Sequence, residues 1–175
     1  MDMVGLTLLV VLAQAQAKPA PVADRKAADD IVVTGERVPR TLKETPSSVA
    51  VITGREIEAQ AADRIDQLLA AIPNVQPGSG VEAPAIRGQD STGVVRELFA
   101  FLGGTRPRAT MTLDGRGVTF TEYVNGAASA WDIDRVEVFR SPQTTTQGRN
   151  SIAGAIFVNS RDPTYSREAR ARAIA

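Results

Sequence analysis

Residues 132–142 read DIDRVEVFRSP, and this stretch decides the fold. The β-prone residues 136–140 predict a strand that ends at the following proline, because proline cannot donate to a strand ladder. Residues 155–158 form a second apolar run, which follows the loop glycines Gly148 and Gly154. The C-terminal part of the chain therefore predicts two strands joined by a glycine-containing connection.

The preceding residues predict further strands and short helices. Residues 48–53 are a β-prone run, and Thr53 with Glu56 has the T-x-x-E spacing of a helix capping box. Apolar residues then recur at helical spacing, at Ile57, Ala61, Ile65, Leu68, Leu69 and Ile72. Asp63 and Asp66 can restart a cap, which divides this stretch into two short helices.

Two more strands complete the expected sheet. They lie at residues 85–88 and 109–113, and Asp114-Gly115 after the second is a hairpin-type turn. About five strands and two or three helices predict an α+β fold, with a small mixed β-sheet of about four to five strands and short helices packed on it.

The composition excludes several classes of protein. Of the 175 residues, 43% are hydrophobic and 23% are charged, which is a globular balance. Lys plus Arg is 20 and Asp plus Glu is 20, so the chain lacks the basic surplus typical of nucleic-acid-binding proteins. It has no cysteine and no histidine, so neither a disulfide, a thiolate metal site nor a Ser-His-Asp or Cys-His triad can form within it.

Two carboxylate pairs are candidates for acid–base or metal chemistry. Asp132 and Asp134 lie two residues apart, as do Glu56 and Glu58. Neither pair has EF-hand spacing, and a solvated or salt-bridged role is the simpler interpretation. The loop at 148–154 lacks the Lys-Ser/Thr ending of a phosphate-binding loop. The residues therefore favour a binding or gating module without cofactor or metal over an enzyme.

The N-terminus has the features of an export signal. Residues 4–12 form an apolar stretch too short to span a bilayer, and residues 15–17 (AQA) supply a small-x-small cleavage pattern. Residues 1–17 are therefore predicted to be a signal peptide, with a frayed apolar N-terminus as the alternative. Residues 18–45 are polar and contain prolines, which predicts a flexible tether.

A short β-prone stretch interrupts this tether. Residues 31–34 read IVVT and are followed by Gly35. Such a stretch can pair with the sheet edge of a partner through backbone hydrogen bonds. It can equally be an edge strand of the following domain, and the residues alone leave both interpretations open.

Six elements in the order of the chain resemble the plug domain of TonB-dependent outer-membrane receptors. The first, DIVVT at 30–34, is similar to the TonB box of that family. The others are VAVIT at 49–53 followed by LLAAIPNV at 68–75, IRG at 86–88, LDG at 113–115, the stretch at 132–142 and GRNSIAGAI at 148–156. The resemblance runs from about residue 30 to residue 163.

The resemblance implies roles for particular residues. It gives a TonB box that would pair as a strand with the periplasmic protein TonB, formed by Asp30, Ile31, Val32, Val33 and Thr34. It implies that Arg87 and Arg140 pair with glutamates of a surrounding barrel and lock the plug in place. In the chain as given, both arginines are expected to face water. It also gives three glycines in the loops of the plug: Gly88, Gly148 and Gly154.

The implied protein is a receptor in the outer membrane of a Gram-negative bacterium, which takes up a scarce nutrient that is siderophore-like or other. The plug would span residues 46–163 and gate the pore from its periplasmic side. The strands of a barrel of roughly 22 strands need about 220 residues, and 12 residues follow Pro163. Residues 164–175 are interpreted as the stub of the first barrel strand, with a frayed polar tail as the alternative. The alternative function is a truncated or free-standing periplasmic interaction module without transport activity.

Two single residues and one four-residue stretch depart from the family pattern. Ser141 stands where the family has the glycine of R-G-P, and Ala153 replaces the first glycine of the closing pair. TTTQ at 144–147 stands where G-T-L-Y is common. These changes lie in loops, so no ligand is inferred from them.

Overall fold

The structure, a computed structural model, describes residues 31–35, 40–78, 82–90, 107–119, 122–123, 129–148, 150–169 and 171. The expected signal peptide at 1–17, most of the tether and Asp30 lie outside the described residues. So do residues 91–106.

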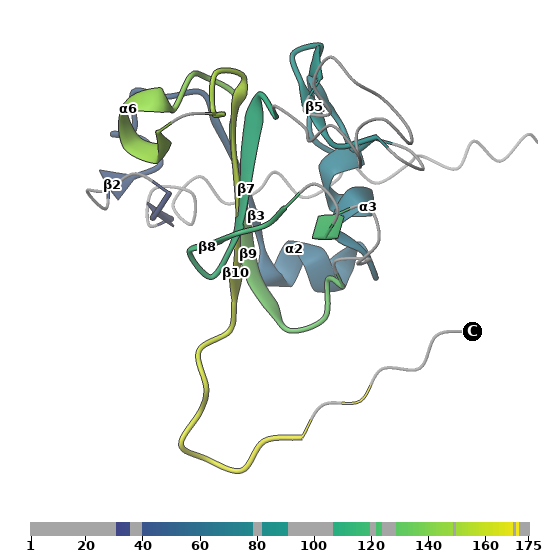
Figure 1. Cartoon of the computed structure of the whole chain (residues 1–175). Helices are drawn as coiled ribbons and strands as arrows, with labels where there is room; N and C mark the ends of the chain where they lie inside the picture. Colours follow the sequence, from purple (N-terminus) through teal and green to yellow (C-terminus); the bar gives the residue numbers. More distant parts are fainter. Residues whose placement is uncertain are drawn as a thin grey trace, which may run out of the picture.

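A five-stranded mixed sheet forms the centre of the domain (Figure 1). Its strands, in spatial order, are β3 (Val49–Thr53), β9 (Ile133–Phe139), β10 (Gly154–Ser160), β7 (Ala109–Leu113) and β8 (Arg116–Gly117). β10 and β7 run parallel, and the other neighbours are antiparallel. This confirms the predicted α+β fold with a small mixed sheet.

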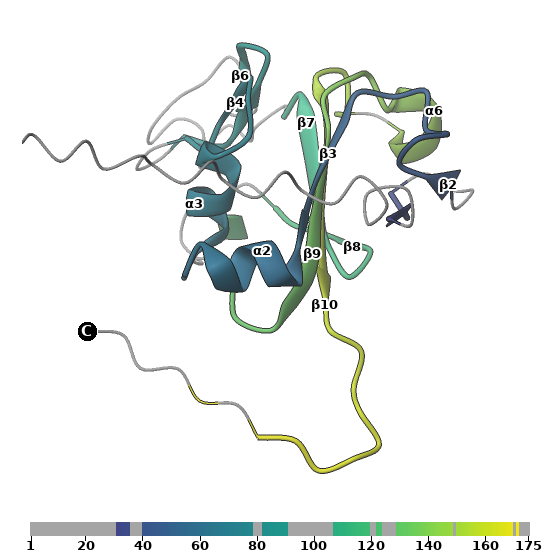
Figure 2. The same cartoon turned by 180° about the vertical axis from the view of Figure 1, so that it is seen from behind.

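Short helices cover one face of this sheet (Figures 1 and 2). The helices are α2 (Gly54–Ala59) and α3 (Ile65–Ala70), so the predicted division into two helices is confirmed. The capping box of α2 is also present, because the Thr53 amide donates to Glu56 Oε2 at 2.7 Å. The helices bury Ile57, Ile65, Leu68 and Leu69 against Ile52, Val136, Val138, Ile156 and Val158 of the sheet. Burying each such side chain stabilises the fold by about 1.5–3 kcal/mol.

The opposite face of the sheet is covered by the N-terminal segment. Strands β1 (Val32–Val33) and β2 (Arg40–Thr41) form a two-stranded antiparallel sheet of their own. The one-turn helix α6 (Thr144–Gln147) lies on the same side as β2 (Figures 1 and 2). Along β9, side chains alternate between the two faces, so Glu137 and Phe139 point toward the side opposite the helices.

A third, three-stranded sheet lies beside α3 and contains β4 (Val75–Gln76), β5 (Ala85–Ile86) and β6 (Gln89–Asp90). Two tight hairpins have both central residues at positive φ, as a type I′ turn requires. Asp114 and Gly115, at 50° and 78°, join β7 to β8, which confirms the predicted turn. Arg87 and Gly88, at 52° and 73°, join β5 to β6. Residues 161–169, after β10, belong to no helix or strand.

Candidate functional site

The TonB-box-like segment, residues 31–34, lies on the domain as part of the β1–β2 sheet. Val32 pairs with Thr41 and Val33 with Arg40, and the Leu42 amide donates to the Ile31 carbonyl oxygen at 2.9 Å. β1 pairs with β2 and does not join the edge of the five-stranded sheet, while pairing of this segment with a partner stays a prediction. Its pairing strand instead comes from the same N-terminal segment.

The two valines of β1 differ in exposure. Val33 is 1% exposed and packs in a small cluster with Phe139, Ala155 and Phe157. The two phenylalanine rings meet edge to face, with their centroids 5.3 Å apart. Val32 is 42% exposed and borders an open groove of about 770 Å³, lined also by Val51, Arg55 and Arg135. Alternation along β1 therefore anchors one side chain and leaves its neighbour accessible.

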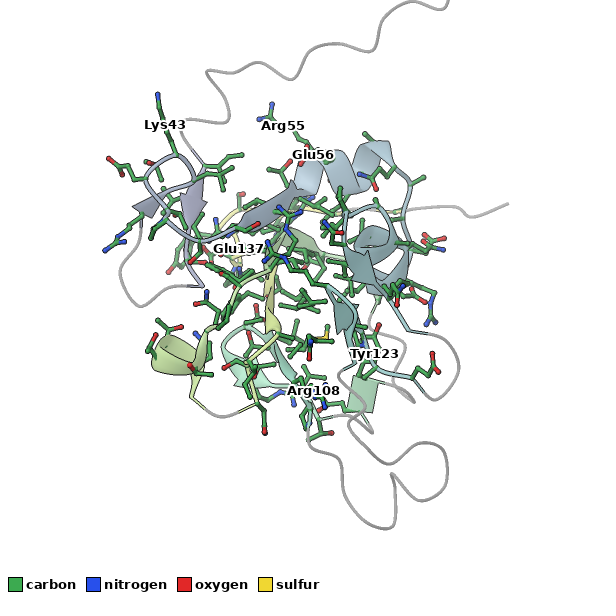
Figure 3. All side chains as sticks on the ribbon, turned by 90° about the horizontal axis from the view of Figure 1, so that it is seen from above. Lys43, Arg55, Glu56, Arg108, Tyr123 and Glu137 are labelled. Carbon is green, nitrogen blue, oxygen red and sulfur yellow. The ribbon has the colours of Figure 1, made fainter. Side chains whose placement is uncertain are left out.

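The chain directly after β1 is held by a buried carboxylate. The Thr34 amide donates to Glu137 Oε1 at 3.1 Å and to Oε2 at 3.0 Å, and the Thr34 hydroxyl donates to Oε1 at 2.8 Å. The Gly35 amide donates to Oε2 at 2.9 Å. Glu137 is fully buried, and Figure 3 shows it among the central strands, with Arg55 and Lys43 at the periphery.

Arg135 compensates the charge of this carboxylate. Its Nε lies 3.1 Å from Glu137 Oε1, and its Nη2 donates to the Thr34 hydroxyl at 3.4 Å. The Nε–H makes no hydrogen bond of good geometry, so the contact with Glu137 is an ion pair. A buried carboxylate is tolerated only when it is paired and hydrogen-bonded, and Glu137 meets both conditions here.

A hydrogen bond and a close packing contact also hold Gly35 in place. Its carbonyl oxygen accepts from Gln147 Nε2 at 3.0 Å. A Cβ at this residue would lie 2.5 Å from ring atoms of Phe139 and of Phe157, so only glycine fits against both rings. Gln147 belongs to the TTTQ stretch that departs from the family pattern, and that stretch forms α6.

The turn at Pro73 and Asn74 brings Arg87 and Arg140 to one place. The Arg87 amide donates to the Asn74 carbonyl oxygen at 2.8 Å. Arg140 Nη1 donates to the neighbouring carbonyl oxygen, that of Pro73, at 3.2 Å. Asn74 itself has a positive φ of 64°. Residues from three separate parts of the sequence therefore meet at this turn.

The two arginines differ in their surroundings. The Arg87 side chain is exposed, and no hydrogen bond or ion pair joins it to another described residue. Arg140 is half-buried, and its Nε is buried without a hydrogen-bond partner among the described residues. Arg87 therefore faces water as expected, whereas Arg140 is only partly exposed because its guanidinium is bonded to the 73–74 turn.

The three predicted loop glycines have different structural reasons. Gly88 and Gly148 have φ values of 73° and 78° with open space around them, so backbone conformation alone favours glycine there. Gly154 lies against Phe139 and begins β10.

Three of the four carboxylates in the two sequence pairs make structural contacts. Asp134 lies in an ion pair with Arg135 at 3.6 Å, Glu58 pairs with Arg161, and Glu56 caps α2. Among the described residues, no three acidic side chains gather where they could share a metal ion. The described helices are also too short and too polar for any of them to cross a membrane.

Two groups outside this region have shifted pKa values. Burial, with a smaller contribution from the Asp66 charge, raises the pKa of Tyr123 to about 12. Its hydroxyl donates to the Pro77 carbonyl oxygen at 2.6 Å. Hydrogen bonds from Arg116, at 3.0 and 2.6 Å, lower the pKa of the exposed Glu122 below its usual value. Figure 3 shows Tyr123 far from Glu137.

Comparison with known families identifies the domain. The family model described as the TonB-dependent receptor plug domain matches residues 41–155. The chain belongs to this family. The matched residues include β3, α2, α3, β7, β8 and β9 and end at the second residue of β10, while β1 lies before them.

Individual relatives are similar in sequence. A vitamin B12 transporter BtuB of Photobacterium profundum is 29% identical over 160 residues, which are 87% of this chain and 24% of the relative. One from Vibrio vulnificus is 32% identical over 135 residues, 74% of this chain and 20% of the relative. The plug-domain chain therefore spans about a quarter or less of the curated relatives that it matches.

Solved structures share the fold. The outer-membrane alcaligin receptor FauA of Bordetella pertussis superposes with a TM-score of 0.59 and 19% identity, covering 77% of this chain and 22% of that structure. The ferripyoverdine receptor of the outer membrane of Pseudomonas aeruginosa gives 0.57 and 20%, covering 76% and 16%.

Sequence reasoning missed the residues that hold the β1 segment. The sequence presents Glu137 and Arg135 only as members of the stretch at 132–142, and it predicts no contact for Gly35 or Gln147. One signal was available: Phe139 and Phe157 fall on the same face of their strands as Glu137, which indicates that this face is also buried.

Proposed function

We propose that this plug domain is the gate of an outer-membrane receptor that takes up a scarce small-molecule nutrient, and that TonB engages it through residues 31–34. The family supports the gating role. The relatives and solved structures are named as transporters or receptors for vitamin B12, alcaligin and ferripyoverdine, which supports a chelate or cofactor-sized ligand. Export through an N-terminal signal peptide and location in the outer membrane belong to the same proposal.

The observation that carries the TonB proposal is the accessible edge of β1. Leu42 and Ile31 form a hydrogen-bonded pair, and bonded and non-bonded pairs alternate in an antiparallel ladder. The peptide groups of Val32 therefore point away from β2, and Val32 itself borders the groove. A strand of TonB that adds at this edge would use main-chain hydrogen bonds, which suit a pulling contact because several of them bear the load together.

The test compares Val32→Pro with Val32→Ala. Proline removes the outward-pointing amide that an added strand would use, while the β1–β2 hydrogen bonds of Ile31 and Val33 are kept. We expect Val32→Pro to abolish binding of the periplasmic part of TonB in calorimetric titration, and Val32→Ala to bind as the unaltered chain does. Equal binding of the two variants would place the TonB contact elsewhere.

The same proposal gives Arg87 and Arg140 the role of locking the plug to carboxylates of a surrounding barrel. Both residues contact the 73–74 turn, Arg87 through its backbone amide and Arg140 through its guanidinium, and this common location supports a shared role. Arginine suits such a contact because it stays charged and binds a carboxylate with two hydrogen bonds.

A further inference from the structure

We propose that Glu137 blocks the outer edge of β1, the edge that faces away from β2. A partner strand that adds at this edge can then extend past Val32 only after the Glu137 carboxylate has released the Thr34 amide. This inference rests on the proposed engagement of residues 31–34 by TonB. It adds a competitor within the plug, because the buried Glu137 carboxylate already binds the Thr34 amide that the partner strand would need.

The geometry of the ladder identifies the contested donor. Because Ile31 and Leu42 form a hydrogen-bonded pair, the peptide groups of Val32 and Thr34 both point away from β2. Val32 is 42% exposed beside the open groove, whereas the Thr34 amide is held by both oxygens of Glu137 at 3.0 and 3.1 Å. The outer edge of β1 is therefore accessible at Val32, whereas the Thr34 amide is already bonded to Glu137.

The Glu137 carboxylate binds the Thr34 amide more strongly than an uncharged side chain would. The same carboxylate accepts from the Thr34 hydroxyl at 2.8 Å and from the Gly35 amide at 2.9 Å. Hydrogen bonds to an ionised group are roughly twice as strong as those between neutral groups. Glu137 is fully buried, so water does not compete for its oxygens while β1 is in place.

Contacts on the other side keep Thr34 in reach of Glu137. Gln147 holds the Gly35 carbonyl oxygen at 3.0 Å, and the rings of Phe139 and Phe157 lie against the Gly35 α-carbon. Arg135 pairs with the carboxylate and also reaches the Thr34 hydroxyl. The fixed point of the segment is thus residues 34–35, which rest on β9 near the middle of the sheet.

This arrangement has a consequence for binding. A partner strand that pairs with Val32 alone gains few hydrogen bonds, so the first contact is weak. Pairing along the whole segment requires Thr34 to exchange its carboxylate acceptor for a carbonyl oxygen of the partner. Removing the carboxylate should therefore strengthen binding, although it removes contacts from the plug itself.

The test uses Glu137→Gln in the chain of 175 residues. The amide has the same shape but no charge, and its NH₂ group cannot accept from Thr34 and Gly35. We expect hydrogen exchange of the Thr34 and Gly35 amides to accelerate about tenfold or more, since hydrogen bonds to a charged group are lost. Affinity for the periplasmic part of TonB should rise by a similar factor of about ten. Glu122→Gln, at an exposed carboxylate distant from β1, is the matched control and should change neither quantity.

If Glu137→Gln disturbs the central sheet, hydrogen exchange at Val138 and Ile156 will be faster than in the unaltered chain. A second variant keeps the test decisive in that case. Gly35→Ala leaves the carboxylate intact but places a Cβ against both phenylalanine rings, and so displaces Thr34 from Glu137. It should give the same acceleration at Thr34 and the same gain in affinity.

The outcomes separate the two proposals. Unchanged hydrogen exchange at Thr34 in both variants would overturn the proposed blocking role of Glu137. Faster exchange with unchanged or weaker TonB binding would also overturn it, while leaving the TonB contact itself in place. Absence of TonB binding in the unaltered chain and in every variant would overturn the proposed function, and with it the blocking role of Glu137.

Discussion

The α-carbon of Gly154 lies directly against the carbonyl oxygen of Phe139, so that a Cβ at residue 154 would overlap this oxygen. The contact occurs where β10 begins and the second strand of its ladder, β9, ends. Gly154 also has a φ of 151°, in a region that other residues rarely adopt. The close approach lets Ala155 pair with Phe139 and fixes the register of the two longest strands.

We expect Gly154→Ala to lower the free energy of unfolding by at least about 3 kcal/mol, because backbone strain costs about 1–3 kcal/mol and forced overlap in a packed interior adds a similar amount. Denaturant unfolding measures this change. Gly117→Ala in β8 is the control: no atom lies within 4 Å of its Cβ position, so it should stay within about 0.5 kcal/mol of the unaltered chain. Equal effects of the two substitutions would contradict the role assigned to Gly154.

The local elements of this plug could be predicted because short-range patterns decide them. The Asp114-Gly115 turn, the capping box at Thr53 and the division between α2 and α3 each depend on residues within a few positions of one another. The strand at residues 133–139 follows from its β-prone run, although it begins three residues earlier than predicted.

The second layer could not be predicted, because its pairing depends on residues distant in the sequence. The pattern around Glu137 indicates that its face of β9 is covered, but it does not indicate what covers it, because Thr34 lies 103 residues away along the chain. Nothing near Arg40 signals that it pairs with Val33. The candidate residues came from family resemblance, and only the structure shows that the 73–74 turn brings Arg87 and Arg140 together.

Tyr123 provides a test by titration. In a Tyr165→Phe variant it is the only tyrosine, so the phenolate absorbance reports its ionisation alone. We expect a midpoint near pH 12, raised from 10.0 mainly by burial. Since the unfolded chain ionises first, the free energy of unfolding should fall as the pH rises from 10 toward 12. In denaturant the midpoint should return to about 10; a midpoint near 10 in the folded chain would contradict the assigned environment.

Export gives a third prediction. The apolar residues 4–12 and the AQA pattern predict cleavage after Ala17. N-terminal sequencing of the protein from the cell envelope of a Gram-negative host should begin at Lys18. Replacing Ala15 and Ala17 by Leu removes the small residues and should leave the precursor uncleaved. A chain that begins at Met1 in that fraction, in the unaltered protein, would rule out the signal peptide.

The last prediction concerns the proposed lock, and Arg87 tests it better than Arg140. Arg140 is half-buried and bonded to Pro73, so Arg140→Ala should destabilise the chain of 175 residues by about 1 kcal/mol whether or not a lock exists. Arg87 has an exposed side chain and a φ of 52°, a conformation that favours glycine. Arg87→Gly should therefore raise the free energy of unfolding of this chain by about 0.5–1 kcal/mol.

In a full-length receptor that contains this plug, the same Arg87→Gly substitution should have the opposite effect. A barrel carboxylate that loses its arginine is left unpaired in a partly shielded pocket, which costs about 3–5 kcal/mol if burial is deep. Hydrogen exchange should then accelerate at residues 84–88, while the central sheet at residues 136–138 keeps its protection. Arg87→Lys keeps the charge but loses the two-pronged contact, so it should give an intermediate rate. If Arg87→Gly slows exchange in the receptor as it stabilises the isolated chain, then Arg87 makes no contact with a barrel and the lock assignment is wrong.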